Sequence, residues 1–305
     1  MIRHKSLTSL GCPLDTGESC FDWCLSSTDI VHDPLLLRER LDRDGYLYLP
    51  GVLDASLVND TREILLTQLY DLGLVDRNGP VSEGRAALPW HAQSLHQLAK
   101  ANPPLWSVLY DGIMLELYEK ILGTEVRHFD FTWLRAIGPG QGTAPHCDSV
   151  YMGRGTRRLF TSWTPLMEIP LNIGGLILIP GSHQVSSLDG YRTGDVDTVC
   201  SNRPHPAPKD VHGWVGPAGD GKLTDDPVEL QRRLGMPWIT AECYRPGDVV
   251  IFNIATIHGS LDNQTNRIRL SCDSRYQPAS EPIDERWIGE DPVGHGKQSR
   301  RDIIC

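Results

Sequence analysis

Apolar residues recur with two different periods along this chain of 305 residues. In the N-terminal part they return every three to four positions, the spacing of helices with one buried face. One helix is predicted from Asp33 to Gly45, because an aspartate before a proline is a typical helix start and a glycine a typical end. A second is predicted from Asp54 to Gly73, and a third over residues 105–122.

After these helices the pattern changes to short apolar or alternating runs separated by glycine and proline. Runs of this kind are typical of strands in a sandwich or a small barrel. They read "VRHFDFTWLRAIGPG", "RRLFTSWTPLM", "GGLILIPGSH", "GDVVIFNIATIHGS" and "RIRLSCDSRYQP". Helices followed by strands predict an α+β protein in which helices pack on a β core.

Two stretches show neither period. Residues 1–32 have little apolar periodicity, and we expect an irregular N-terminal segment. Residues 184–246 are polar and rich in glycine, proline and aspartate. A connection of this length inside a compact domain is usually functional, so we expect an insertion or a lid over an active site. Because no interdomain linker is visible, residues 1–305 are predicted to form a single domain.

Composition narrows the partners and the compartment. The chain has 29 basic and 39 acidic residues, a net charge of −10, which disfavours binding to nucleic acid or to an anionic membrane. No run reaches the roughly 18 apolar residues of a membrane span. The eight cysteines form no CxxC pair and are interpreted as reduced thiols. We therefore expect a cytoplasmic protein without nucleic-acid or membrane partners.

The stretch "TAPHCDSVYMGRG" contains a histidine and an aspartate two positions apart, His146 and Asp148. On an extended strand, residues at this spacing point to the same face. The pair alone is weak, but His258 follows 110 positions after Asp148, just beyond the apolar run "DVVIF". Two histidines and one carboxylate form a facial triad that suits Fe(II) and leaves coordination positions open. A structural zinc site would use four protein ligands instead.

Arg269 lies eleven residues beyond His258. Iron enzymes of this type often use 2-oxoglutarate, whose distal carboxylate needs a cation. Arginine can bind a carboxylate through two parallel hydrogen bonds, which lysine cannot. Ser260, two residues after His258, is a second candidate for that carboxylate. Arg267 and Arg275, on the same predicted strand, are interpreted as surface arginines.

In the order and spacing of its motifs the chain resembles the phytanoyl-CoA dioxygenase family of Fe(II)/2-oxoglutarate oxygenases, particularly its bacterial small-molecule members. The resemblance runs from Asp44 to Pro278. It implies a double-stranded β-helix (jelly roll, cupin-like) core with flanking N-terminal helices. The matching features are His146-Cys147-Asp148, Trp163 in "SWTPLME", "GGLILIPGSH", "RPGDVVIF", His258-Gly259-Ser260 and Arg269.

The resemblance also implies an activity and roles for residues. The cofactors would be Fe(II) and 2-oxoglutarate, and the enzyme would use O₂ to hydroxylate an aliphatic C–H bond of a small molecule, as in secondary metabolism, releasing succinate and CO₂. A carboxylate at position 148 argues against halogenation, because related halogenases have a small residue there. The implied residues are His146, Asp148 and His258 as iron ligands and catalytic centre, Arg269 and Ser260 on the distal carboxylate, and Trp163 and Trp133 beside the cosubstrate.

The substrate side is less specified. Tyr151, Met152 and Arg154 follow the first two ligands and are candidates for substrate contact, Arg154 for an anionic group. A solvated glycine turn is the alternative for this stretch. Two other functions stay open: a metal-dependent β-helix enzyme that does not use 2-oxoglutarate, and a non-catalytic binding protein on the same scaffold. No motif indicates an oligomeric state.

Overall fold

The larger of two main β-sheets is organised by its longest strand, β14 (Arg269–Pro278), in which every residue is buried. The computed structural model describes residues 6–90, 95–197 and 221–294. Within them β14 pairs antiparallel with three strands, β5, β6 and β7. The six strands are β4 (Tyr46–Leu49), β12 (Val249–Asn253), β7 (Phe160–Pro165), β14 and β5 (Val126–His128) in spatial order, with β6 (Trp133–Ile137) also on β14.

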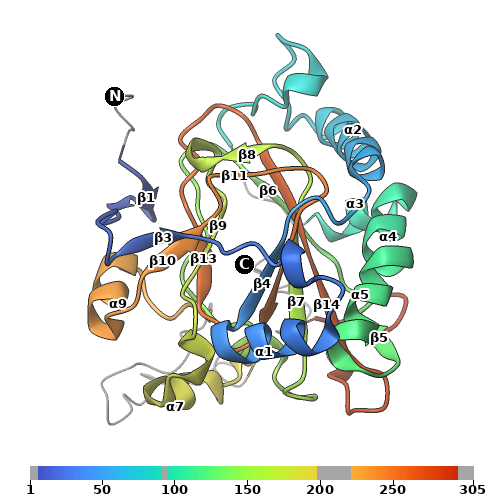
Figure 1. The fold of residues 1–305 in the computed structure, drawn as a ribbon. Helices are drawn as coiled ribbons and strands as arrows, with labels where there is room; N and C mark the ends of the chain where they lie inside the picture. The colour runs from blue at the N-terminus through green and yellow to red at the C-terminus, as the bar shows by residue number, and fades with distance from the viewer. Residues whose placement is uncertain (1–5, 91–94, 198–220, 295–305) are drawn as a thin grey trace.

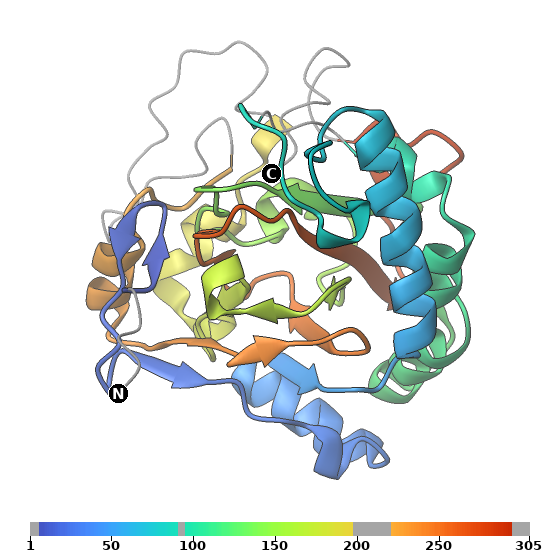
Figure 2. The ribbon, with the colours of Figure 1, turned by 90° about the horizontal axis from the view of Figure 1, so that it is seen from above.

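A second sheet supplies the opposite wall of the β core (Figure 2). Its strands, in spatial order, are β13 (His258–Ser260), β9 (Leu176–Leu178), β10 (Trp238–Thr240) and β3 (Phe21–Trp23). Trp163 of the first sheet and Leu176 of the second belong to one buried apolar cluster. Two smaller antiparallel pairs are β1 (Thr8–Ser9) with β2 (Cys12–Pro13), and β8 (Ile169–Pro170) with β11 (Cys243–Tyr244). Two facing sheets with flanking helices confirm the predicted α+β jelly-roll architecture.

The first two helices begin where the capping residues predicted. The carboxylates of Asp33 and Asp54 accept hydrogen bonds from backbone N–H groups of the first turns of α1 (Pro34–Asp44) and α2 (Ala55–Asp71). Helix α1 ends at Gly45, which has a φ of 77°. A Cβ atom there would lie 2.4 Å from Nδ1 of His183, so both the backbone and the packing require glycine.

The single helix predicted over residues 105–122 is wrong: two helices occupy this stretch. Helix α4 (Pro103–Tyr110) ends at Asp111, whose backbone is extended, and α5 (Gly112–Leu122) starts there. The Asp111 carboxylate accepts from the backbone N–H of Gly112. Both helices bury apolar residues, so the apolar pattern continues across the break. Helices α2, α4 and α5 lie together on one side of the molecule (Figure 1).

The other α-helices among the described residues have eight residues or fewer. They are α3 (His96–Lys100), α6 (Ser149–Met152), α7 (Asp189–Arg192) and α9 (Pro227–Leu234). Helix α9 lies beside β3 and β10, away from the α2, α4 and α5 group (Figure 1). Among the described helices none is long and apolar enough to cross a membrane.

The N-terminal segment is more regular than expected. Its described part, residues 6–32, contains β1, β2 and β3, and β3 runs parallel to β10. This pairing joins residues more than 200 positions apart, which no local pattern reveals. The 184–246 segment likewise contributes β10 and β11 to the sheets, as well as α7 and α9. Its residues 198–220 lie outside the described residues, and the lid role stays a prediction.

Candidate active site

Two of the three predicted metal ligands are joined through their backbones. His146 follows β6 and forms an isolated antiparallel bridge with His258, the first residue of β13. Each backbone N–H donates to the other residue's carbonyl, at 2.9 and 3.0 Å. Asp148 has helical backbone angles and immediately precedes α6. The expectation of a straight strand from His146 to Asp148 is therefore wrong, and the turn into α6 brings the carboxylate to the histidines.

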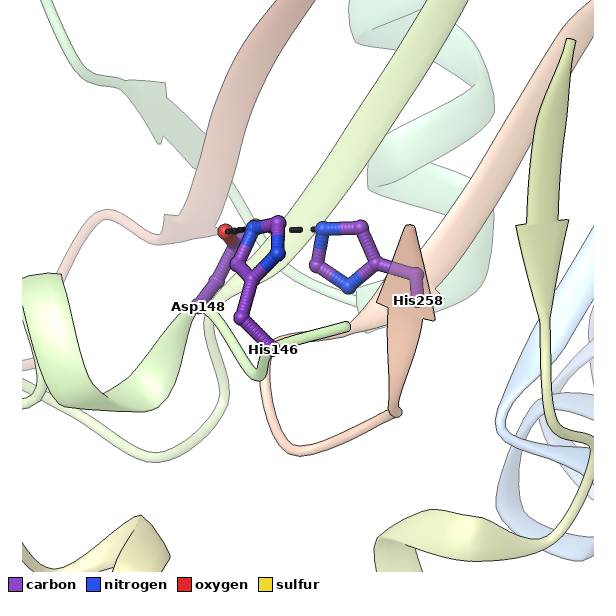
Figure 3. Close-up of side chains that lie close together, drawn as sticks. All are labelled: His146, Asp148 and His258. Atoms are coloured by element: carbon purple, nitrogen blue, oxygen red, sulfur yellow. Dashed lines mark ion pairs between the residues drawn. The ribbon is translucent and has the colours of Figure 1, made fainter. Parts of the chain in front are cut away.

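The three side chains point toward one another (Figure 3). The possible ligand atoms of His146, Asp148 and His258 all lie within 4.8 Å of one another, and all three residues are buried. Oδ1 of Asp148 is 3.6 Å from Nε2 of His146 and 3.7 Å from Nε2 of His258. One nitrogen from each imidazole and one carboxylate oxygen thus face a common point.

Backbone carbonyls fix the orientation of both imidazole rings. Nδ1 of His146 lies 2.8 Å from the carbonyl oxygen of Ala144, and Nδ1 of His258 lies 3.1 Å from that of Thr256. Because a carbonyl only accepts, each Nδ1 carries the proton and each Nε2 keeps a lone pair toward Asp148. Burial, together with the neighbouring His146 ring, lowers the pKa of His258 to about 3. His258 is therefore a neutral, ligand-competent imidazole at neutral pH.

The second oxygen of Asp148 is held by two side chains. Oδ2 accepts from Oγ1 of Thr161 at 2.5 Å and from Nη2 of Arg275 at 2.9 Å. Burial by itself raises the pKa of Asp148, but the charge of Arg275 and the interactions with the two histidine rings outweigh it and hold that pKa well below its usual value. Asp148 is thus an anion with only Oδ1 left to bind a metal. Two imidazole nitrogens and one carboxylate oxygen are a donor set that fits Fe(II).

Arg269, Ser260 and Trp163 line one small cavity together with the two histidine ligands. Arg269 is 1 % exposed, and its Nη1 donates to the carbonyl of Gly174. Burial first, and then the charge of Arg135, lower the pKa of Arg269 to about 9, so it stays cationic at neutral pH. The predicted cosubstrate residues therefore share a pocket with the metal ligands.

At the Arg269 end of β14, two buried polar atoms have no hydrogen-bond partner among the described residues. They are Nε of Arg269 and Oγ of Ser271. Buried donors without partners are rare in native proteins, so they indicate a place for a ligand. A carboxylate is the group that a guanidinium N–H binds best, and 2-oxoglutarate fits this end of the cavity.

Trp133 does not line the cavity that contains Arg269. Its ring instead lies 4.2 Å from Cζ of Arg275, a cation–π contact. Trp133 therefore contacts a residue that itself binds Asp148. Its role beside the cosubstrate stays a prediction.

The interpretation of Arg275 as a surface residue is wrong. The side chain is 1 % exposed and binds Asp148. Sequence reasoning also missed Thr161, and Arg135, whose Nε lies 2.6 Å from Oδ2 of Asp273 at the cavity wall. The period of two that pairs Arg269 with Ser271 continues to Asp273 and Arg275, so the strand pattern held the signal.

The three candidates for substrate contact lie in different surroundings. Tyr151 is buried with its ring centre 5.7 Å from that of His146, and Met152 is buried in an apolar cluster. The Arg154 side chain is 47 % exposed, and its Nε lies 2.6 Å from Oδ2 of Asp195. The structure thus brings Tyr151 to the metal ligands and places Arg154 in a surface ion pair.

Comparison with known proteins identifies relatives that share most of the chain. A model of the family described as phytanoyl-CoA dioxygenase matches residues 41–271. The 1-deoxypentalenic acid 11-beta-hydroxylases of Streptomyces exfoliatus and Streptomyces arenae are each 28 % identical to the chain over 271 residues. The alignments cover 83 % of this chain and 84 % of each relative.

Similar solved structures confirm the fold. The epimerase SnoN from nogalamycin biosynthesis, solved with Fe³⁺, alpha ketoglutarate and nogalamycin RO, is 23 % identical with a TM-score of 0.54, covering 87 % of this chain and 94 % of that one. EctD from S. alaskensis is 20 % identical with a TM-score of 0.56, covering 92 % and 90 %.

The matched residues include all three candidate ligands and Arg269. The resemblance predicted from the motifs is confirmed, and with it the Fe(II)- and 2-oxoglutarate-dependent oxidoreductase class. The chain belongs to the phytanoyl-CoA dioxygenase family.

Proposed function

We propose that the chain hydroxylates an aliphatic C–H bond of a small molecule, with 2-oxoglutarate and O₂ consumed and succinate and CO₂ released. The observation that carries the proposal is the buried cluster of two histidines and Asp148, whose histidines line one cavity with a buried arginine. A metal site alone would suit many reactions. A cation at the far end of the same cavity is what a dicarboxylate cosubstrate needs.

Each residue has a defined task in this proposal. Nε2 of His146, Oδ1 of Asp148 and Nε2 of His258 hold Fe(II). Arg269 and Ser260 bind the distal carboxylate of 2-oxoglutarate. When bound, the metal and its cosubstrate supply the oxidising power for C–H cleavage.

The rest of the pocket orients these groups and excludes water. Trp163 is 2 % exposed and covers the cavity beside Arg269. Oγ of Ser260 accepts from the backbone N–H of Thr143 at 2.8 Å, which leaves its hydroxyl proton for a ligand. Trp133 stacks on Arg275 and so supports the side of the site at which Asp148 lies. Tyr151 and Met152 are the candidates for substrate contact.

The relatives support hydroxylation of a small-molecule acid. The 1-deoxypentalenic acid hydroxylases of Streptomyces share 28 % of their aligned residues with this chain and cover most of it. The proposal also includes one domain over residues 1–305, action in the cytoplasm, and no nucleic-acid or membrane partner. The net charge of −10 supports the expected absence of nucleic-acid and membrane partners.

The first experiment is an anaerobic titration of the full chain with Fe(II) and then 2-oxoglutarate, followed by the visible metal-to-ligand charge-transfer band. We expect the band with the wild type and its loss in His146→Ala. Succinate release on aeration would then serve to screen substrates. Iron binding without a band would contradict the use of 2-oxoglutarate and favour another metal-dependent reaction.

A further inference from the structure

Arg275 has more hydrogen-bonding capacity than its known partner uses. Its Nη2 binds Oδ2 of Asp148 at 2.9 Å. Its Nε and Nη1 are buried and have no partner anywhere in residues 6–90, 95–197 and 221–294. Buried cationic donors are normally paired, because leaving them without partners is costly. Two unused donors beside a metal ligand therefore indicate a missing acceptor.

The guanidinium is held so that it binds only in its own plane. The ring of Trp133 lies 4.2 Å from its Cζ and covers a face. Trp133 in turn packs against Phe131 and Trp287, at centroid distances of 4.5 and 4.7 Å. Trp133 and Phe131 are buried. The stacked arginine is thus preorganised, and its aromatic surroundings suit an organic anion better than a strongly hydrated one.

Arg275 cannot bind the same carboxylate group as Arg269. The two arginines are six residues apart on β14, so their Cα atoms are separated by roughly 20 Å at about 3.3 Å per residue. Arg269 lines the cavity with Trp163 and Ser260, whereas Arg275 contacts Asp148 and Trp133. The strand therefore presents one cation at each side of the metal centre.

The charge balance of the metal centre also indicates that an anion binds beside Arg275. Arg275 and Asp148 balance each other, and the two histidines add no charge when they act as ligands. A divalent metal would leave an excess of two positive charges, which carboxylates from the cosubstrate and the substrate can offset.

We propose that Arg275 is a carboxylate-binding residue of the active site, separate from Arg269, and that Arg275 binds an organic carboxylate beside the metal through one of its two free donor groups, Nε or Nη1. This inference rests on the proposed function. The carboxylate has two sources, the 2-oxo acid end of the cosubstrate or an acid group of the substrate. Both use the same chemistry, a planar anion against a fixed guanidinium.

The test compares Arg275→Lys with Thr161→Val in the full chain, loaded anaerobically with Fe(II). Lysine keeps a charge beside Asp148 but has no planar array of donors at the positions of Nε and Nη1. Thr161→Val removes the other partner of Asp148 and leaves Arg275 intact. Calorimetry measures the binding of 2-oxoglutarate and of pyruvate, which has only the 2-oxo acid end. If the cosubstrate is the source, Arg275→Lys weakens both by about 10-fold or more. Thr161→Val, kept at saturating Fe(II) because its metal affinity is lower, weakens both by a smaller factor. Arg269→Lys then weakens 2-oxoglutarate alone.

A second arm tests the substrate as the source. Adamantane-1-carboxylate and 1-adamantanemethanol are titrated into the protein holding Fe(II) and 2-oxoglutarate without O₂. If the source is the substrate, the wild type prefers the carboxylate by about 10-fold, and Arg275→Lys removes the preference while 2-oxo acid binding is unchanged. Either pattern supports the proposal.

Two results would overturn it. One is Arg275→Lys binding all four probes like the wild type. The other is Thr161→Val producing the same losses, since Arg275 would then act only by positioning Asp148. If Arg275→Lys does not fold, the wild type loaded with Zn(II) is used instead. The Arg275 Nε–H or Nη–H resonances should move downfield with pyruvate or the adamantane acid, and unchanged resonances with both acids contradict the proposal. If the wild type shows the Fe(II) charge-transfer band with 2-oxoglutarate, the proposed function stands even when these tests contradict the role of Arg275.

Discussion

The two ends of the active-site pocket are built differently. At the metal end every ligand has a second contact: both histidines bind backbone carbonyls, and Asp148 binds Thr161 and Arg275. At the other end Arg269 donates from Nη1 to the Gly174 carbonyl, and its Nε has no described partner. The fold thus fixes the metal ligands themselves in advance, whereas Arg269, the residue expected to bind the cosubstrate, keeps donor capacity for it.

The largest expected effect comes from removing a ligand at the fixed end. Asp148→Ala should weaken Fe(II) binding by more than about 100-fold, beyond the loss typical for outer partners of a metal ligand. Anaerobic calorimetry with Fe(II) measures it, with circular dichroism to check the fold because Arg275 loses its partner. Fe(II) affinity within about 10-fold of the wild type would mean that Asp148 is not a ligand.

A change at the open end should leave the metal in place. Arg269→Lys retains a cation but loses the paired N–H groups, so 2-oxoglutarate binding should fall by about 10- to 100-fold while Fe(II) affinity is retained. The charge-transfer band at increasing 2-oxoglutarate gives the affinity. Equal affinity in variant and wild type would place the distal carboxylate elsewhere, and a parallel loss of Fe(II) would remove the distinction between the two ends.

A smaller effect should follow from removing one outer contact at the metal end. Thr161→Val deletes the hydroxyl that donates to Oδ2 of Asp148 and leaves Arg275 on the same oxygen. We expect Fe(II) affinity to fall by about 10-fold, the lower end of the range for such partners. Competition with a coloured chelator measures this, and an unchanged affinity would show that Arg275 alone positions the carboxylate.

The smallest effect is expected outside both ends. Arg154 is half-exposed and pairs with Asp195 and Asp197 on the surface. Arg154→Ala should change the free energy of unfolding by about 1 kcal/mol or less and leave Fe(II) and 2-oxoglutarate binding as in the wild type. Thermal melts and the same titrations test this. A selective loss of turnover with an acidic substrate would instead restore Arg154 as a substrate residue.

The sequence was most informative where the chemistry is local. Asp33 and Asp54 cap helices through neighbouring backbone N–H groups, so their positions alone predicted both starts. The break at Asp111 was missed because the apolar pattern continues through it. Strand β3 was missed because it forms only by pairing with β10 far along the chain.

The same rule explains the site. His146, Asp148, His258 and Arg269 have side chains whose types and order indicate a chemistry. The period of two along β14 puts Arg275 on the same face as Arg269, but only the fold shows that it is buried against Asp148. Residues that position a metal ligand are recognised by their contacts with distant parts of the chain, and local sequence spacing does not reveal such contacts.

The backbone bridge between His146 and His258 has a thermodynamic consequence. It closes a loop of more than 100 residues with two reciprocal hydrogen bonds. The conformational entropy of bringing the two imidazoles together is therefore lost when the chain folds and not when the metal arrives. The apo protein already holds a preformed chelate, in which the second histidine is at high effective concentration once the first has bound.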